Sequence, residues 1–175
     1  MILKLKRTPG IYLVGFMGCG KTVVGARLAE ALGWRFVDVD HEIEKEQKLS
    51  IAEIFDARGE PAFRKLETEA IRRLVRMIQT GKAMVVALGG GAFVNPLNRK
   101  LLEENGVTVW LDCPLYLILD RLRECSDRPL ARDPEKLEAL YHARRASYSL
   151  ADYRIEVSGD DPQQAVAKIL TLPIF

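Results

Sequence analysis

Residues 15–22 carry the most specific chemical pattern in the sequence. They read Gly-Phe-Met-Gly-Cys-Gly-Lys-Thr and match G-x-x-x-x-G-K-[ST], a loop that binds nucleotide phosphates. Glycines let backbone N–H groups converge on the phosphates, and a helix that begins there adds its positive end. Lys21 would reach the terminal phosphates, and the Thr22 hydroxyl would ligate Mg²⁺. We therefore expect ATP with Mg²⁺, bound by Gly18, Cys19, Gly20, Lys21, Thr22 and Val23.

A pair of carboxylates ends the next apolar run. Asp38 and Asp40 are separated by one residue, and in a strand that spacing puts both side chains on one face. One carboxylate can then join the Mg²⁺ shell, while the other binds a hydroxyl group that acts as a nucleophile. The alternative is a polar strand end at which Asp40 or His41 caps a helix.

Short apolar runs and helical patterns alternate along the chain and must position these residues. The predicted strands cover 11–14, 34–39, 83–88, 107–111 and 153–157, and the predicted helices cover 21–32, parts of 41–80, 95–106, 114–124, a segment ending near 149 and the segment after 161. Alternation of this kind favours a mostly parallel five-stranded sheet with helices on both faces, a three-layer α/β/α fold. The phosphate loop and the aspartates follow strands, at the edge where such sheets bind ligands.

Composition narrows the classes of function. The 175 residues suit a single domain over 1–175, and a net charge of +2 is too small to indicate nucleic-acid binding. Apolar runs are too short for a membrane span and residues 1–7 do not resemble a signal peptide, so we expect a cytoplasmic protein with no membrane partner. Cys19, Cys113 and Cys125 lack metal-binding spacing and are expected to be reduced thiols.

A longer pattern covers residues 51–67 and reads Ile51-x-x-Ile54-Phe55-x-x-x-Gly59-Glu60-x-x-Phe63-Arg64-x-x-Glu67. Together with GFMGCGKTVVG and DVD, this pattern resembles the shikimate kinase family, and the resemblance covers essentially the whole chain. It implies a P-loop kinase fold like that of nucleoside monophosphate kinases, with a substrate-binding region at about 38–66 and a lid at about 123–134. It also implies ATP-dependent phosphorylation of shikimate to shikimate 3-phosphate, with ADP as product, on the route to chorismate and aromatic amino acids.

The resemblance assigns roles on the acceptor side. Asp40 would hold substrate hydroxyls and orient the attacking one, and Asp38 would reach Mg²⁺. Arg64 would bind the carboxylate of shikimate, with Glu67 orienting its guanidinium. Further contacts would come from two apolar side chains and from the backbone of a glycine turn, namely Phe55, Phe63, Gly89, Gly90 and Gly91. On spacing alone, a solvated helical salt bridge would explain Arg64 and Glu67, and core packing would explain the phenylalanines.

Arginines dominate the implied lid and its surroundings. The Arg128-Pro129-Leu130 segment resembles the family's lid, so Arg128 would contact the phosphates and stabilise charge in the transition state. Arg121 would lie near the adenine, where a guanidinium can stack on the base, and Pro162 would lie on the adenine side. A basic, solvated loop is the alternative for both arginines.

The pattern Arg145-x-x-Tyr148-x-x-Ala151-Asp152 also resembles a segment of the family. This resemblance implies that Arg145 is a second clamp on the substrate carboxylate, with Arg144 as the alternative. Two arginines suit a carboxylate, although they could also hold a phosphate. Another small-molecule kinase, acting on gluconate or a nucleoside monophosphate, therefore stays open as a second function.

A non-catalytic sensor of shikimate or ATP is the alternative from a different class. Such a protein would be expected to lose a catalytic group, but Lys21, Asp40 and Arg128 are all present. A GTPase is disfavoured because no N-K-x-D motif occurs. The small-molecule partners that we expect are ATP and shikimate, and the resemblance implies a monomer.

Overall fold

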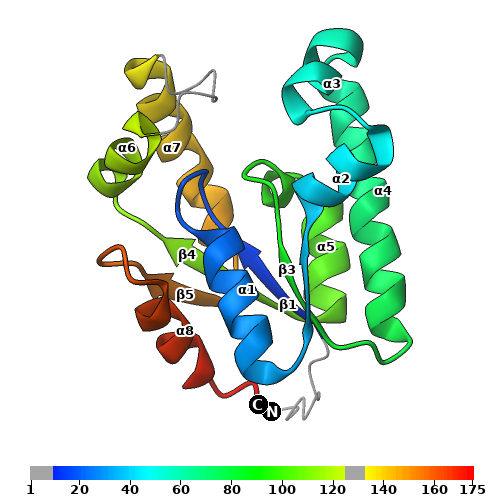
Figure 1. The fold of residues 1–175 in the computed structure, drawn as a ribbon, viewed down its shortest axis with the longest axis vertical. Helices are drawn as coiled ribbons and strands as arrows, with labels where there is room; N and C mark the ends of the chain where they lie inside the picture. The colour runs from blue at the N-terminus through cyan, green and yellow to red at the C-terminus, as the bar shows by residue number, and fades with distance from the viewer. Residues whose placement is uncertain (1–9, 125–132) are drawn as a thin grey trace.

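The computed structural model describes residues 10–124 and 133–175 (Figure 1). At its centre lies a five-stranded sheet in which each strand runs parallel to its neighbours. The strand order is β2-β3-β1-β4-β5, with β1 at Gly10–Val14, β2 at Arg35–Asp38, β3 at Met84–Ala87, β4 at Val107–Asp112 and β5 at Tyr153–Glu156. The predicted five-stranded parallel sheet is confirmed, and β1 lies in its middle.

Helices cover both faces of this sheet, as the three-layer prediction requires. On one face of the sheet, α1 contacts α8 (Figure 1). On the other face, α4 contacts α5, and the short 3₁₀ helix η1 contacts α7. The helices are α1 Lys21–Leu32, α2 Val39–Gln47, α3 Ile51–Arg58, α4 Glu60–Gln79, η1 Ala92–Val94, α5 Pro96–Asn105, α6 Leu115–Arg123, α7 Pro134–Tyr148 and α8 Pro162–Leu170.

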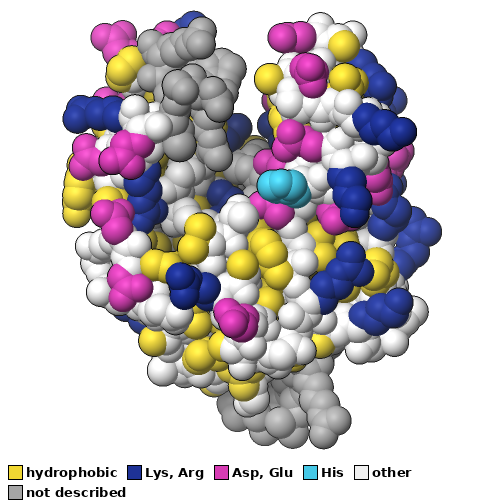
Figure 2. Space-filling view, in the orientation of Figure 1, with side chains coloured by type: hydrophobic (Ala, Val, Ile, Leu, Met, Phe, Trp, Pro, Cys, Tyr) yellow, Lys and Arg dark blue, Asp and Glu magenta, His cyan; other side chains and the backbone are white. Residues whose placement is uncertain are grey.

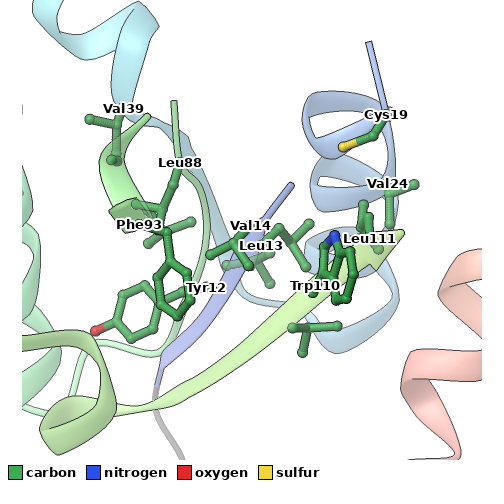
Figure 3. Close-up of a cluster of buried hydrophobic side chains, with 14 of the residues drawn as sticks. Tyr12, Leu13, Val14, Cys19, Val24, Val39, Leu88, Phe93, Trp110 and Leu111 are labelled. Carbon is green, nitrogen blue, oxygen red and sulfur yellow. The ribbon is translucent and has the colours of Figure 1, made fainter. Parts of the chain in front are cut away.

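The central strands are buried on both faces, which explains why they read as continuous apolar runs. Every residue of β1 and of β3 is buried. Figure 3 shows how Leu13 and Val14 of β1 share the core with Leu111 of β4 and Val24 of α1. Complete burial of one such side chain contributes about 1.5–3 kcal/mol, so this core holds the carboxyl ends of the strands in fixed positions.

One boundary differs from the prediction in a way that matters for the site. The predicted strand extends to residue 39, but β2 ends at Asp38 and Asp40 lies in the first turn of α2. Asp38 accepts hydrogen bonds from the backbone N–H groups of Asp40 (3.0 Å) and His41 (3.3 Å). These bonds satisfy free donors at the helix start, so Asp38 is the cap. Capping by Asp40 or His41 is therefore wrong.

The predicted lid at 123–134 falls largely on residues 125–132, which lie outside the described residues. Cys125 and Arg128 belong to this segment. Within the two described ranges, no helix is both long and apolar enough to cross a membrane.

Candidate active site

The phosphate loop joins β1 to α1 and presents backbone groups to a cavity. Gly20 is the residue before α1 and has φ 95°, a left-handed conformation that glycine adopts without strain. Lys21 begins the helix, and its Nζ donates to the carbonyl oxygens of Gly15 (2.8 Å) and Phe16 (3.0 Å). The sequence therefore folds locally into a helix N-terminus with a lysine beside it, which is the arrangement that binds phosphates.

Cys19 and Val23 occupy opposite environments in this loop and its helix. The Cys19 side chain is buried, with its Sγ 3.7 Å from Lys21 Nζ. Val23 is exposed on the first turn of α1, and both residues line the cavity. The Cys19 side chain therefore packs as a small core group, and its backbone is what the loop can offer to a ligand.

Thr22 and Asp38, the two predicted Mg²⁺ ligands, are in direct contact. The Thr22 hydroxyl donates to Asp38 Oδ2 at 2.6 Å, while Asp38 Oδ1 caps α2. Mg²⁺ prefers oxygen ligands and usually binds through one or two protein groups together with substrate phosphates. The Thr22 hydroxyl and the Asp38 carboxylate, side by side at the phosphate loop, fit this preference. The capping bonds explain how Asp38 is fixed for this task.

Asp40 lies in the first turn of α2 and lines the cavity. Among the described residues, its buried Oδ1 has no hydrogen-bond partner. Burial raises the pKa of Asp40, and the nearby negative charge of Asp38 raises it further, against the opposing charge of Lys21. The side chain as a whole is half-buried and lines the cavity, so its carboxylate can accept a hydrogen bond from a ligand hydroxyl.

Arg64 and Glu67 lie one turn apart on α4 and face the same cavity. Arg64 Nη1 donates to Glu67 Oε1 at 2.9 Å, and Arg64 Nη2 donates to Glu60 Oε1 at 3.2 Å. Glu67 is 1% exposed, and burial raises its pKa although Arg64 opposes the shift. The solvated salt bridge that spacing alone favours is therefore wrong for Glu67, because one partner is buried. Sequence reasoning missed Glu60 as the second partner of Arg64.

Two phenylalanines form an apolar wall beside this ion pair. The rings of Phe55 on α3 and Phe63 on α4 have centroids 4.9 Å apart, and the Arg64 guanidinium lies over the Phe63 ring at 5.3 Å. Phe63 is buried whereas Phe55 is half-buried, and both line the cavity. They therefore serve packing and the cavity surface together.

The glycine turn after β3 is where charged side chains meet. A Cβ atom on Gly89 would lie 2.8 Å from Asp40 Oδ1 and 2.9 Å from Glu67 Oε2, and one on Gly91 would lie 2.7 Å from Arg64 Nη1. A side chain at either position would displace these polar groups from where they lie. The consequence is a backbone surface with two carboxylates and a guanidinium packed against it.

Arg144, and not Arg145, is the arginine of α7 that reaches this turn. Arg144 Nη1 lies 3.2 Å from the position of a Cβ on Gly90, and Tyr148 Oη donates to Gly90 O at 2.5 Å. Arg145 instead donates to Asp112 at 2.6 and 3.1 Å, and the described cavity lining includes Arg144 without Arg145. The prediction of Arg145 as the clamp is wrong. Arg144 and Arg145 stand four and three residues before Tyr148, and both spacings place neighbours on one helix face, so the sequence does not choose between them.

Arg121 on α6 connects the phosphate loop to the segment between β5 and α8. It donates to the carbonyl oxygens of Gly18 (2.9 Å) and Gly159 (3.0 Å), and it pairs with Asp160 at 3.2 Å. Pro162 begins α8 beside this segment. Arg121 is therefore a fixed part of the cavity wall and not a solvated lid residue.

A cavity of about 1400 Å³ connects the phosphate loop, the glycine turn and the segment before α8. Figure 2 shows the molecule hollowed between the side that carries α6 and α7 and the side that carries α2 and α3. The predicted site residues that line it are Gly18, Cys19, Gly20, Lys21, Thr22, Val23, Asp38, Asp40, Phe55, Phe63, Arg64, Glu67, Gly89, Gly90, Gly91, Arg121 and Pro162.

A P-loop kinase is the class that this fold and this phosphate loop define. The family model described as shikimate kinase matches residues 17–172, and the chain belongs to the shikimate kinase family. The shikimate kinase of Sulfurihydrogenibium sp. (strain YO3AOP1) is 44% identical over 162 residues, which cover 92% of this chain and 95% of that protein. The shikimate kinase of Geobacter sulfurreducens is 46% identical over 164 residues, covering 92% and 88% of the two chains.

A solved structure agrees with this assignment. The shikimate kinase of Acinetobacter baumannii in complex with shikimate superposes with a TM-score of 0.85 at 41% identity, and the match covers 93% of this chain and 91% of that chain. The structure of the shikimate kinase of Aquifex aeolicus gives a TM-score of 0.81 at 36% identity, with 92% and 94% covered.

Proposed function

We propose that the protein transfers the γ-phosphoryl group of ATP to a hydroxyl of shikimate, giving ADP and shikimate 3-phosphate for the synthesis of chorismate and aromatic amino acids. The observation that carries this proposal is the cavity in which a phosphate loop faces Asp40, Arg64 and Arg144 around the glycine turn. A cavity with phosphate-binding backbone at one end and two guanidiniums at the other suits a kinase whose acceptor is a small carboxylate.

On the nucleotide side, the backbone of the phosphate loop would cradle the phosphates and Lys21 would leave its carbonyl partners for the terminal phosphate oxygens. Arg121 and Pro162 would border the adenine, because Arg121 contacts Gly159 and Asp160 just before α8 begins at Pro162. Val23, which is exposed on the first turn of α1 and lines the cavity, would also contact the nucleotide. Arg128 remains our proposed contact of the lid with the transferred phosphoryl group.

Mg²⁺ would be held by Thr22 and Asp38, whose oxygens lie 2.6 Å apart. When bound, the ion would supply charge neutralisation for the β- and γ-phosphate oxygens. Asp38 accepts two backbone hydrogen bonds, which hold its carboxylate beside the Thr22 hydroxyl.

On the acceptor side, Arg64 and Arg144 would bind the carboxylate of shikimate while Phe55 and Phe63 contact its ring. Glu67 would hold the Arg64 guanidinium in position through the 2.9 Å bond. The backbone of Gly89, Gly90 and Gly91 would allow close approach of the substrate, since a side chain there would fill the space.

Asp40 would accept the hydrogen bond of the attacking hydroxyl and take its proton as the phosphoryl group moves. A carboxylate with a raised pKa binds a proton more strongly than an exposed one, which favours this transfer. Transfer of this kind depends mainly on positioning and on neutralised charge. Closing the cavity over both substrates would also keep water from accepting the phosphoryl group.

The proposal includes a monomer that acts in the cytoplasm, where ATP is available.

A coupled ADP-release assay tests the function. The protein is given Mg²⁺ and ATP with shikimate, gluconate, AMP or CMP in separate reactions. We expect ADP release above the background only with shikimate. Turnover with gluconate or a nucleotide and none with shikimate would overturn the substrate, and ATP binding without turnover on any acceptor would favour a sensor.

A further inference from the structure

Asp112, at the end of β4, forms a charged cluster that the proposed reaction does not use. Its side chain is only 7% exposed, yet two arginines donate to its carboxylate. Arg145 donates through Nη1 (2.6 Å) and Nη2 (3.1 Å), and Arg154 donates through Nε (2.8 Å). One buried carboxylate therefore joins a strand of the sheet core, the edge strand β5 and helix α7.

The side chain of Trp110 supports both arginines. Trp110 and Asp112 are two apart on β4 and so lie on the same face of the sheet. Arg154 is the cross-strand neighbour of Trp110 on β5. The guanidiniums of Arg145 and Arg154 lie 5.0 Å and 5.2 Å from the Trp110 ring. The two arginines share the carboxylate and the ring but belong to different elements, and Arg154 is more exposed (52% against 32%) and also pairs with Glu156 at 3.4 Å.

Arg145 has one further contact that Arg154 lacks. Its Nη1 donates to Tyr141 Oη at 2.9 Å, and Tyr141 Oη donates to Cys113 O at 2.9 Å. Cys113 follows Asp112 directly. One turn of α7 is therefore tied at two points to the end of β4.

Arg144, the residue directly before Arg145 on this helix turn, lines the substrate cavity. Arg144 lies against Gly90, and Tyr148, four residues further on, donates to the Gly90 carbonyl oxygen. Within α7 the buried residues are Leu137, Tyr141 and Tyr148, out of 15 residues in the helix. Leu140 also packs against the core. The turn that carries Arg144 is therefore held by apolar packing together with the polar contacts of Tyr141 and Arg145.

We propose that Asp112 and Arg145 are positioning residues for substrate binding: their ion pair fixes the turn of α7 that carries Arg144 to the glycine turn. The inference rests on the proposed function, because Arg144 is assigned there to the substrate carboxylate. Arg145 touches no substrate in this account and acts only through the placement of its neighbour.

The structure provides a matched control for this role. Arg145→Gln and Arg154→Gln each remove one guanidinium from Asp112 and from the Trp110 ring, and each leaves the other arginine to neutralise the buried carboxylate. The Tm of each variant reports how much stability the cluster loses, so that loss can be separated from the kinetic effect. Release of α7 follows only from Arg145→Gln.

The test measures kcat/KM for shikimate, KM for ATP and Tm for both variants. We expect Arg145→Gln to lower kcat/KM for shikimate about tenfold, mainly through KM, within the range of coupling inside one contact network. KM for ATP should stay within about twofold of the unsubstituted value, and Arg154→Gln should stay within about twofold on all kinetic values. Arg145→Lys, which keeps one charged contact, should recover part of the loss.

A double-mutant cycle with Arg144→Met separates positioning from general damage. Because Arg145 acts through Arg144, adding Arg145→Gln to Arg144→Met should change kcat/KM for shikimate by less than about twofold.

Two kinds of result would overturn the inference. Equal kinetic effects of Arg145→Gln and Arg154→Gln, or a full tenfold loss that persists in the Arg144→Met background, would overturn it while leaving the proposed function intact. Absence of shikimate-dependent ADP release from the unsubstituted protein would overturn the proposed function and this inference together.

Discussion

The phosphate loop is one continuous stretch, residues 15–22, whereas the acceptor side takes its groups from α2, α3, α4, the glycine turn and α7. The loop works mainly through backbone N–H groups, which any sequence with the right glycines can present. The acceptor side works through side chains whose positions depend on how separate helices pack. The nucleotide half is therefore set by local sequence, and the acceptor half by tertiary structure.

Charge divides the two halves as well. The acceptor half contains two carboxylates, Asp40 and Glu67, that approach the same glycine and whose pKa values are raised by burial. Arg64 lowers the pKa of both, although burial outweighs it. We expect substitutions in the acceptor half to affect acceptor binding or proton transfer. Substitutions in the loop should instead affect binding of the ATP phosphates.

The largest effect is expected for Asp40→Asn, which keeps the shape of the side chain but removes the proton acceptor. We expect kcat to fall about 10²- to 10⁴-fold with KM for ATP little changed. Steady-state ADP release at saturating shikimate measures this. Activity within threefold of the unsubstituted protein would show that Asp40 takes no proton in the reaction.

Lys21→Met tests the nucleotide half. Removal of one charge-stabilising group in an active site costs about 10²- to 10³-fold in kcat, and shikimate binding should be unaffected because Lys21 lies on the loop. Tryptophan fluorescence or calorimetry can follow shikimate binding without turnover. Loss of shikimate affinity as large as the loss of kcat would contradict the division into two halves.

Arg64→Lys tests the carboxylate clamp. Lysine keeps the charge but cannot make the two-pronged contact, so KM for shikimate should rise about 10- to 100-fold, as expected for loss of a hydrogen bond between charged groups. KM for ATP should not change. Glu60→Gln is the control, because Glu60 also contacts Arg64 but is 62% exposed, and it should change KM by less than threefold. Similar effects of the two variants would argue against the clamp.

The smallest effect concerns stability and its pH dependence. Because burial, followed by Asp38, raises the pKa of Asp40 in the folded protein, the folded state binds this proton more tightly than the unfolded chain. The cost of charged Asp40 is thus absent below the ordinary aspartate pKa and complete above the raised one. Asp40→Asn removes this cost, so Tm should rise at neutral pH by about 2–4 °C for each kcal/mol added to the free energy of unfolding. The rise in Tm should become smaller as the pH falls. Thermal unfolding followed by circular dichroism measures it, and an equal or lower Tm at neutral pH would contradict it.

Sequence reasoning found most of the site because the informative residues follow strands or stand at helical spacing. Thr22 with Asp38 and Arg64 with Glu67 were predicted as pairs and lie within hydrogen-bond distance. Asp40 was placed correctly at the cavity but on the wrong element, since the cap formed by Asp38 ends the strand one residue early.

The arginines of α7 show where this reasoning stops. Arg144 and Arg145 are adjacent and identical in type, so only the orientation of the helix decides which one faces the cavity. That orientation depends on Asp112, which is 33 residues from Arg145 in sequence and 42 from Arg154. No local pattern reports contacts of this separation, and the charged cluster was accordingly missed.

Identification of the phosphorylated product tests the central claim most directly. The protein is incubated with Mg²⁺, ATP and shikimate, and the mixture is analysed by mass spectrometry and ³¹P nuclear magnetic resonance, with Asp40→Asn as the control. The account predicts one product, shikimate carrying a phosphate on its 3-hydroxyl, formed in equal amount with ADP and absent from the control. ADP with inorganic phosphate and unmodified shikimate, or a phosphate on a different hydroxyl, would contradict it.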